Sequence, residues 1–532
     1  MAKNISIWTQ DFKEFIESGA FYVDKTKQID KLVNSTDKYY FLSRPRRFWK
    51  SLTLSMMKFL YLWKKELFKW LYIEDKWDWE KTSPVIYMSF AGYTQDQNIE
   101  EYIDDNFKVF IPSRGTKVDD DQFKLSDFWW KYNIAKILDL IYEKTWKKSA
   151  VIVDEYDKAV LVNITNIPEA EKMRAFFTSF YAGVKDNDDK IEIFMLTGLT
   201  KILKMSVFSV LNNLKDLSFS PMWYDLMWYT WEEVKNNFWE EIEILQNKFN
   251  FSEEETKTKI KDYYNWFNFW SENSEETIFN PWNINSLFQN FQFSYFWADT
   301  WIPSAILNYV SEESIDVLEI VEELKSWYLM VSETEFKLTD LNNINVVVLF
   351  ANAGYFTIKK AENNIYTLWY PNKETESVMT EFFIKLLKSN YKISLVKRIA
   401  DALYEWIINK NKELLEETFD KMIYWFMWET AYEWINRNPE GWLKTFIWMF
   451  LRMNNIYYYP EIQNLKWRSD LVIPVNNKYY IIEAKVNESA QKAIEQIDKL
   501  YIPQFTDWKE IIKVWINWDK ENKDFEIKII KN

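Results

Sequence analysis

The chain has 532 residues, 48% of them hydrophobic, which fits roughly two to four domains with buried cores. Its 66 basic and 80 acidic residues leave a net charge of −14, which excludes a general electrostatic coat for nucleic acid and leaves only a local basic patch. Neither cysteine nor histidine occurs, so disulfides, thiolate metal sites and imidazole chemistry are excluded, and carboxylates, lysine, arginine and Mg²⁺ remain.

Nothing in the sequence predicts a membrane protein or a secreted one. No apolar run approaches the roughly 18 residues of a membrane span, and the N-terminal residues lack the apolar core of a signal peptide. We therefore expect a cytoplasmic protein that has no membrane partner.

Tryptophan and glycine occur in unusual numbers, with 30 Trp and only 7 Gly. A chain of this length ordinarily carries about 37 glycines. Trp49, Trp146 and Trp518 stand where a phosphate loop, a helix end and a hairpin turn favour glycine. We infer that most of the tryptophans are glycines in the living source, as happens when a UGA codon for Gly is read as Trp. The alternative is a protein truly rich in aromatics, because 39 Phe and 32 Tyr also occur. The exceptions, where an aromatic is natural, are Trp79, Trp282 and Trp297.

Three regions follow one another along the chain. Residues 1–215 alternate short apolar strands with helical stretches, which predicts an α/β domain with a parallel sheet. Residues 216–380 are expected to be a mostly helical linker region with a small hairpin, of winged-helix type, near 352–368. Residues 381–532 are expected to form a compact α/β domain at the end of the chain. The strands predicted in the first region are 39–42, 85–90, 150–153 and 191–196.

A degenerate phosphate loop of the Walker A type follows the first of these strands, over residues 43–51, if residue 49 is glycine. Its backbone N–H groups would cradle phosphate at a helix N-terminus, whereas a tryptophan at position 49 would fill that space. Lys50 would reach the β- and γ-phosphates, and the Ser51 hydroxyl would hold Mg²⁺. Three arginines of the loop are phosphate- or nucleic-acid-binding candidates, the alternative being a solvated basic loop. They are Arg44, Arg46 and Arg47.

An acidic pair closes the third predicted strand, in the manner of a Walker B motif. Asp154 would join the Mg²⁺ shell, and Glu155 would orient or activate the attacking water. Thr197, at the end of the next strand, could sense the γ-phosphate. The alternative for the acidic pair is a solvated turn.

Several stretches of this region resemble the AAA-ATPase-like domain at the N-terminus of many bacterial proteins. The resemblance implies a P-loop NTPase fold, ATP and Mg²⁺ as cofactors, ATPase activity and the ability to form a homo-oligomer. The family has glycine at the positions of Trp8 and Trp49, and it lacks the first Walker A glycine, where Arg44 stands. The matching stretches are 7–12, 21–26, 44–48, 152–157, 196–198 and 211–214.

A second acidic group lies near the C-terminus. Asp470 opens a predicted strand, and the returning strand of the hairpin ends in Glu483-Ala484-Lys485, with Glu483 and Lys485 on one face. Asp470 and Glu483 would hold Mg²⁺, and Lys485 would orient water or stabilise developing charge, as a phosphodiesterase requires. Glu440 could add a carboxylate, and Gln496 lies on a plausible phosphate-positioning helix. The alternative is an edge strand whose charges face water.

This ordered set resembles the PD-(D/E)xK nuclease fold, in the version that follows the AAA-ATPase-like domain. The resemblance implies a catalytic core of Asp470, Glu483 and Lys485, with Glu440 and Gln496 accessory. We therefore expect an ATP-binding protein, an ATPase, coupled to a Mg²⁺-dependent nuclease that cleaves nucleic acid, with DNA as the expected partner. One alternative is a nucleotide-dependent regulatory or nucleic-acid-binding protein without nuclease activity, and another is an ATPase whose C-terminal domain is a relic.

Overall fold

A computed structural model of the chain divides into two compact units, which are described separately. The first comprises residues 1–315 and 330–374, and the second comprises residues 316–329 and 375–532. The structure describes residues 3–6, 9–47, 49–112, 121–124, 134–201, 211, 213–218, 220–266, 278–297, 304–312, 320, 323–324, 329–337, 344–387, 448, 459–460, 463–464, 467–468, 471–475, 478–487, 494–495, 497–501, 510–519 and 524–531.

A seven-stranded mixed sheet with the order β4-β3-β2-β5-β6-β1-β7 is the centre of the first unit. Strands β1, β2, β5, β6 and β7 are parallel to one another, whereas β3 and β4 pair antiparallel. This confirms the predicted α/β fold class. The strands are β1 Tyr39–Ser43, β2 Val85–Ser89, β3 Lys108–Ile111, β4 Asp121–Lys124, β5 Ser149–Asp154, β6 Ile191–Gly198 and β7 Lys215–Asp216.

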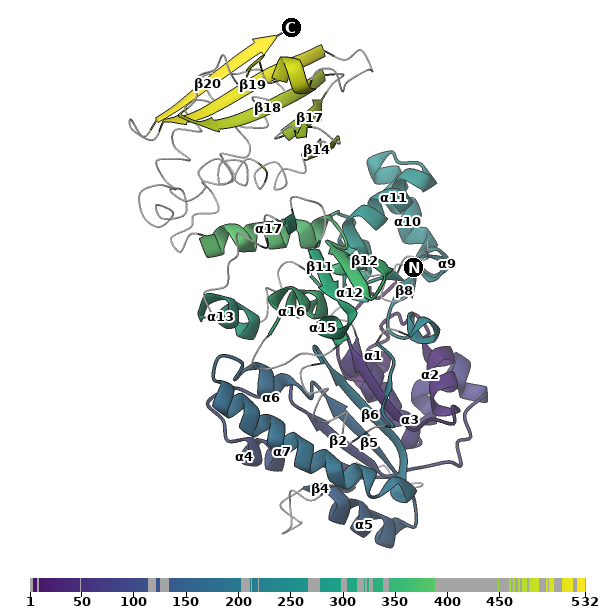
Figure 1. The fold of residues 1–532 in the computed structure, drawn as a ribbon. Helices are drawn as coiled ribbons and strands as arrows, with labels where there is room; N and C mark the ends of the chain where they lie inside the picture. The colour runs from purple at the N-terminus through teal and green to yellow at the C-terminus, as the bar shows by residue number, and fades with distance from the viewer. Residues whose placement is uncertain are drawn as a thin grey trace. The chain divides into compact units, whose positions relative to one another are not determined.

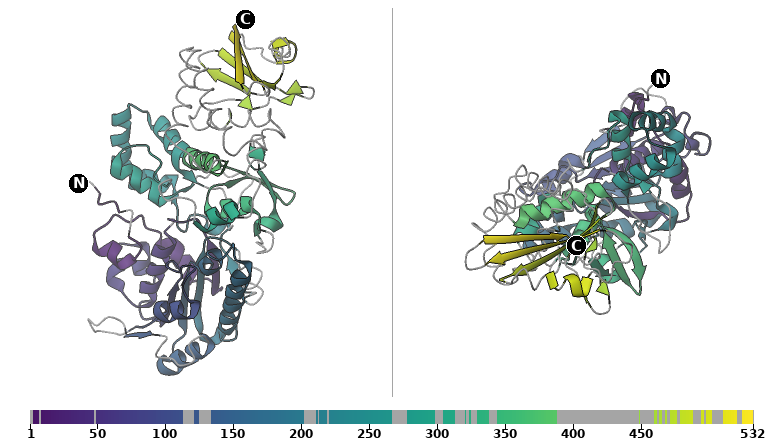
Figure 2. Two further views of the ribbon diagram at one scale, coloured as in Figure 1. Left: turned by 90° about the vertical axis from the view of Figure 1, so that its left-hand side faces the viewer. Right: turned by 90° about the horizontal axis from the view of Figure 1, so that it is seen from above.

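Helices cover both faces of this sheet (Figures 1 and 2). The connection from β1 to β2 contains α3, and that from β5 to β6 contains α7; the two connections run in opposite directions across the sheet. Because parallel crossovers are right-handed, these two helices lie on opposite faces. The helices of this part are α1 Phe12–Glu17, α2 Thr26–Val33, α3 Lys50–Tyr61, α4 Ile99–Asn106, α5 Ile134–Thr145, α6 Lys158–Leu161 and α7 Ile167–Lys185.

The central strands are buried along their whole length. All residues of β1 and β5 are buried, as is usual for parallel strands covered on both faces. The four strands predicted from apolar runs lie within two residues of their expected bounds.

The rest of the first unit is helical, with two small three-stranded sheets of order β8-β10-β9 and β11-β13-β12. Strands β12 and β13 form a hairpin through Asn363 and Asn364, whose φ angles of 51° and 63° suit a tight turn. The helices are α9 Trp231–Asn237, α10 Trp239–Phe249, α11 Glu253–Tyr264, α12 Pro281–Asn290, α13 Ser304–Glu312, α15 Glu333–Lys337, α16 Val346–Ala353 and α17 Lys373–Leu387, the last continuing into the second unit. The strands are β8 Tyr229–Thr230, β9 Asn265–Trp266, β10 Ile278–Phe279, β11 Leu329–Ser332, β12 Thr357–Glu362 and β13 Ile365–Trp369.

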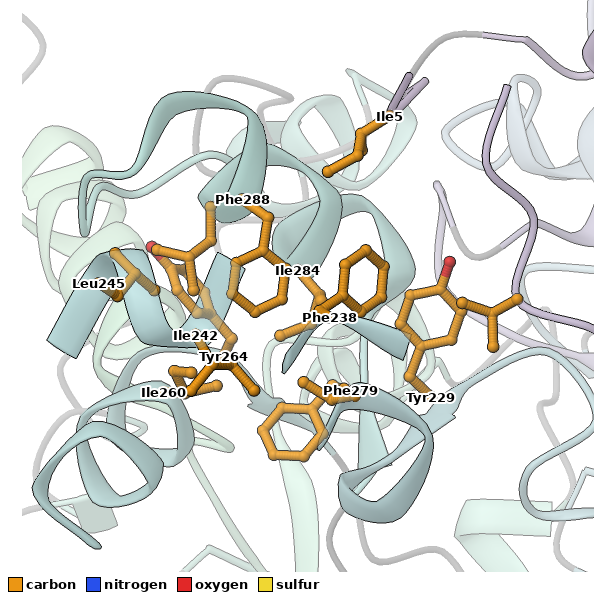
Figure 3. Close-up of a cluster of buried hydrophobic side chains, with 13 residues drawn as sticks. Ile5, Tyr229, Phe238, Ile242, Leu245, Ile260, Tyr264, Phe279, Ile284 and Phe288 are labelled. Atoms are coloured by element: carbon orange, nitrogen blue, oxygen red, sulfur yellow. The ribbon is translucent and has the colours of Figure 1, made fainter. Parts of the chain in front are cut away.

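A buried apolar cluster joins this helical part to the beginning of the chain (Figure 3). Ile5 and Val23 pack with Phe238, Ile284 and other side chains of β8 to α12. Burial of apolar surface is the main source of stability in a core, so this cluster holds the helical part and the beginning of the chain together within the first unit.

The second unit contains a five-stranded sheet of order β14-β17-β18-β19-β20. Only β18 and β19 are parallel, and the other neighbours are antiparallel. The turn predicted at residues 517–519 is wrong, because β19 continues to Asp519 and Trp518 stands opposite Phe525 in the pairing of β19 with β20. The strands are β14 Tyr459–Pro460, β17 Leu471–Val475, β18 Lys478–Val486, β19 Glu510–Asp519 and β20 Asp524–Lys531, with a separate pair β15 Gln463–Asn464 and β16 Trp467–Arg468.

Within the described ranges, no helix combines the length and the apolar character that crossing a membrane requires.

Candidate functional site

The phosphate loop connects β1 to α3, as predicted, and folds around Lys50. This lysine is the first residue of α3 and is buried. Its Nζ donates hydrogen bonds to the backbone oxygens of Arg44 (3.0 Å) and Pro45 (2.8 Å). Burial lowers the pKa of Lys50, while Glu155 and Asp154 oppose that shift. The ammonium therefore lies inside the loop, where its charge can meet a phosphate.

Ser51, Asp154 and Thr197 meet at the carboxyl edge of the sheet. The Ser51 hydroxyl donates to Asp154 Oδ2 and the Thr197 hydroxyl donates to Asp154 Oδ1, both at 2.6 Å. Asp154 is buried, so the solvated turn weighed as an alternative is wrong for this residue. A hydroxyl beside a carboxylate is an oxygen donor set that Mg²⁺ accepts, so Ser51 and Asp154 fit the metal role predicted for them.

Glu155 follows Asp154 in a left-handed backbone conformation with φ 51°. Burial raises the pKa of its carboxyl, and the charges of Asp154 and Asp157 add to this, whereas Lys50 and Arg46 oppose it. A carboxylate with a raised pKa is a better proton acceptor, as a general base requires. Non-glycine residues in this conformation are strained and cluster at functional sites.

Asp157 is a site-supporting residue that sequence reasoning did not assign. Its buried carboxylate accepts hydrogen bonds from Leu199 N (3.1 Å), Thr200 N (2.6 Å) and the Thr200 hydroxyl (2.7 Å). Gly198 permits this approach, since a Cβ there would lie 2.6 Å from Asp157 Oδ1 and from the Tyr156 ring. The hydrogen bonds between Asp157 and Thr200 connect the segment after β5 to the segment after β6, next to Asp154 and Glu155.

The three arginines of the loop have different surroundings. Arg44 is buried, and its Nη1 donates to the backbone oxygens of Ser43 (3.0 Å) and Ser218 (2.7 Å). Burial lowers its pKa to about 9, against the opposing charge of Asp216. The solvated loop considered as an alternative is therefore wrong for Arg44, whose guanidinium binds carbonyl oxygens of the protein.

Arg46 and Arg47 lie nearer the acidic pair and the helical part of the unit. The charge of Arg46 lowers the pKa of Glu155. Arg47 adopts φ 62°, and its Cζ lies 4.2 Å from the centre of the Trp282 ring. Trp297 Nε1 donates to the Arg46 backbone oxygen at 3.4 Å. Both arginines thus contact tryptophans of the helical part, Arg46 through its backbone oxygen and Arg47 through its side chain.

Trp49 has the left-handed conformation expected of a glycine, with φ 53° and ψ 21°. Its indole packs against Phe15, Tyr22 and Tyr229, with ring centres 5.5 to 6.0 Å away. A left-handed conformation costs a residue with a Cβ roughly 1–2 kcal/mol. The ring contacts accommodate an indole at position 49, whereas the left-handed backbone there favours glycine over tryptophan.

Other tryptophans show the same conformation. Trp63, Trp70 and Trp146 have φ angles of 65°, 70° and 56°, and Trp70 and Trp146 are 94% and 79% exposed. An exposed indole buries little apolar surface to offset the strain. The tryptophans expected to be genuine differ, since Trp282 and Trp297 are buried and Trp79 Nε1 donates to Glu74 O at 2.7 Å.

In the second unit, Glu483 and Lys485 lie on the central strand β18. Glu483 is fully buried, and Lys485 Nζ lies 2.9 Å from its Oε1. Because β17 and β19 flank β18, the edge strand with solvated charges considered as an alternative is wrong. Leu471 pairs with Ile482, while Trp515 and Asn517 of β19 stand opposite Glu483 and Lys485. Outside the described residues lie Trp8, Glu440, Asp470 and Gln496. Within those that are described, no three acidic side chains gather as metal ligands.

The parallel sheet, the loop before α3 and the Ser51–Asp154–Thr197 group are consistent with an N-terminal P-loop NTPase-like domain of mixed α/β class. Residues 6–208 match the AAA-ATPase-like family, which is described as a predicted AAA-ATPase. The chain is also 27% identical over 520 residues to an uncharacterised protein from the vnfD 5′ region of Azotobacter chroococcum mcd 1, an alignment that covers 94% of each chain. No solved structure matches the chain.

Proposed function

We propose that the first unit binds ATP with Mg²⁺ and hydrolyses it. The observation that carries this proposal is the double hydrogen bond of Asp154 to Ser51 and Thr197, which joins the phosphate loop to two neighbouring strand ends. Mg²⁺, when bound, would supply positive charge against the phosphate oxygens. Lys50 would exchange the carbonyl oxygens of Arg44 and Pro45 for the β- and γ-phosphates.

Glu155 is the residue that we assign to the attacking water. It would accept a proton from that water as the water oxygen bonds to the γ-phosphorus. The bond from the γ-phosphorus to the bridging oxygen then breaks, which leaves ADP and phosphate. The raised pKa of Glu155 and its place beside Asp154 suit this role.

An ATP titration of the full-length protein carrying Trp49→Gly tests the nucleotide site. We expect binding that Lys50→Ala weakens at least tenfold, about 1.4 kcal/mol, because the lysine charge is lost. Lys58→Ala is the matched control, since Lys58 lies on the same helix and bonds to Asp11 instead. No ATP binding by the Trp49→Gly protein would refute the proposal.

We further propose that glycine stands in the living source at the four tryptophans that are left-handed among the described residues, at positions 49, 63, 70 and 146. Their positive φ angles support this, as does the exposure of two of them. The mass of a peptide that contains residue 49, from protein of the native source, distinguishes the residues directly. A tryptophan mass would refute the recoding at the loop.

For the second unit we propose a Mg²⁺-dependent nuclease, with DNA as substrate, that is controlled by the nucleotide state of the first unit. Its support is the Glu483–Lys485 pair at 2.9 Å on one face of β18, together with the resemblance of the surrounding sequence to PD-(D/E)xK nucleases. Asp470→Ala and Lys485→Ala should each abolish Mg²⁺-dependent cleavage of DNA and leave ATP binding intact. Lys478→Ala, on the same strand, is the matched control because Lys478 bonds to Glu510. Cleavage that persists in both site variants would refute the nuclease.

One observation favours a second candidate function, a nucleotide-dependent regulatory protein that binds nucleic acid without cutting it. Glu483 is fully buried, and a buried carboxylate beside a lysine can serve the core of the sheet alone. Such a protein would bind DNA equally in Mg²⁺ and in a chelator, and no Mg²⁺ concentration would yield cleaved product.

A further inference from the structure

The first turn of α17 is fastened to the first unit by several long-range hydrogen bonds. Glu374 accepts from the Trp297 backbone N–H and from Asn283 Nδ2, the latter at 2.7 Å. Lys373 Nζ lies 2.8 Å from Asp262 Oδ2, and Asn372 Nδ2 donates to Asn265 O at 2.9 Å. The boundary between the two compact units falls directly after Glu374, inside the helix. The helix thus begins in one unit and continues into the other.

The carboxyl group of Glu374 is fully buried, so its stability depends on the hydrogen-bond donors around it. A buried carboxylate is costly unless donors compensate it, and removing one donor leaves the cost uncovered. The Trp297 N–H, the Asn283 amide and the positive end of α17 provide that compensation. A movement of Trp297 or Asn283 therefore displaces Glu374, and with it the start of α17.

Both partners of Glu374 also connect to the phosphate loop. Trp297 donates through Nε1 to the Arg46 backbone oxygen at 3.4 Å. Asn283 follows Trp282, whose ring is covered by the Arg47 guanidinium at 4.2 Å. Two routes thus lead from adjacent arginines of the loop to the same buried carboxylate.

Nucleotide binding is expected to change the backbone conformation of the phosphate loop. Lys50 now donates to the backbone oxygens of Arg44 and Pro45, and a phosphate would compete for that ammonium. Released carbonyl groups change the path of the residues that follow, which are Arg46 and Arg47. The disturbance then reaches Trp297 and Trp282.

We propose that Glu374 is a positioning residue that couples nucleotide occupancy of the phosphate loop to α17 and so to the second unit. The inference rests on the proposed ATP binding, and it assigns the regulation of that site to a particular residue. The 15 residues of α17 span about 22 Å, so a tilt of about 5° at Glu374 moves the far end by about 2 Å.

Hydrogen exchange of residues 376–387 tests this coupling in the full-length Trp49→Gly protein, with and without ATP and Mg²⁺. We expect ATP to change the exchange rate of this helix about fivefold or more. Glu374→Gln keeps the side-chain shape and removes the charge, and Trp297→Phe keeps a ring and removes the Nε1 donor. Both should still bind ATP and lose the response of α17. Trp77→Phe, a matched buried tryptophan against Tyr61, should keep it.

The outcomes separate this inference from the proposed function. If the Trp49→Gly protein does not bind ATP, the proposed function is refuted and the coupling with it. If ATP binds and α17 does not respond, or if the response persists in both Glu374→Gln and Trp297→Phe, only the coupling is refuted. Trp297→Phe serves as the second variant should Glu374→Gln fail to fold.

Discussion

Replacing Trp70 and Trp146 by glycine should stabilise the first unit. Both residues hold a left-handed backbone, with φ 70° and 56°, and expose 94% and 79% of their surface. Relief of the left-handed strain contributes roughly 1–2 kcal/mol. The extra freedom of glycine in the unfolded chain costs about 0.5–1 kcal/mol of that. The exposed indoles bury little surface, and the Trp146 ring has Tyr142 as a neighbour with ring centres 6.1 Å apart.

The net expectation is a gain of about 1 kcal/mol in the free energy of unfolding for each variant. Urea unfolding monitored by circular dichroism measures it as a higher midpoint at unchanged slope. Trp239→Gly is the matched control, because Trp239 is 57% exposed but begins α10 in a helical conformation. It should gain nothing. Loss of stability in both Trp70→Gly and Trp146→Gly would refute the strain argument and weaken the recoding at these positions.

Two further predictions concern the nucleotide site. In the Trp49→Gly protein, Glu155→Gln should lower ATP hydrolysis by roughly 10²–10⁴-fold while ATP still binds. Because burial raises the pKa of Glu155, the parent rate should fall as pH drops through that raised pKa and the base becomes protonated; a pH–rate profile with no such acid limb would contradict the assignment. Gly198→Ala should destabilise the first unit by about 1–3 kcal/mol, because its Cβ would meet Asp157 and Tyr156 at 2.6 Å. Thermal unfolding measures this, with Gly92→Ala as the control, since its Cβ would meet only Tyr102 Oη at 3.4 Å.

The sheet and the heart of the nucleotide site follow from the sequence for clear reasons. Strands such as β5 are buried on both faces, so they are continuous apolar runs that are easily recognised. Their carboxyl ends share one edge, which places Asp154 beside Thr197 once both strands are assigned. The glycine-like behaviour of Trp49 and Trp146 was also predictable, because a phosphate loop and a helix end demand a left-handed residue.

Other features depend on contacts that are distant in sequence. Arg44, Arg46 and Arg47 look equivalent in the sequence, but the Ser218 carbonyl, 174 residues away, holds Arg44 inside the protein. The sequence around Trp518 is typical of a turn, but β19 continues through it to Asp519. The turn is displaced because residues 517–519 of β19 pair with residues 524–526 of β20, a contact that local sequence does not reveal.

Backbone strain at the proposed nucleotide site is an argument that the site is functional and not a relic. Arg47 and Glu155 have positive φ angles and lie at the loop and at the end of β5. Such conformations cost roughly 1–3 kcal/mol each and persist only where the surroundings enforce them. The enforcing contacts here are the Arg47–Trp282 stacking, the bonds from Lys50 to its own loop and the tie between Asp157 and Thr200. A site without function would have no reason to keep two strained residues under such control, which supports the ATP site that we propose.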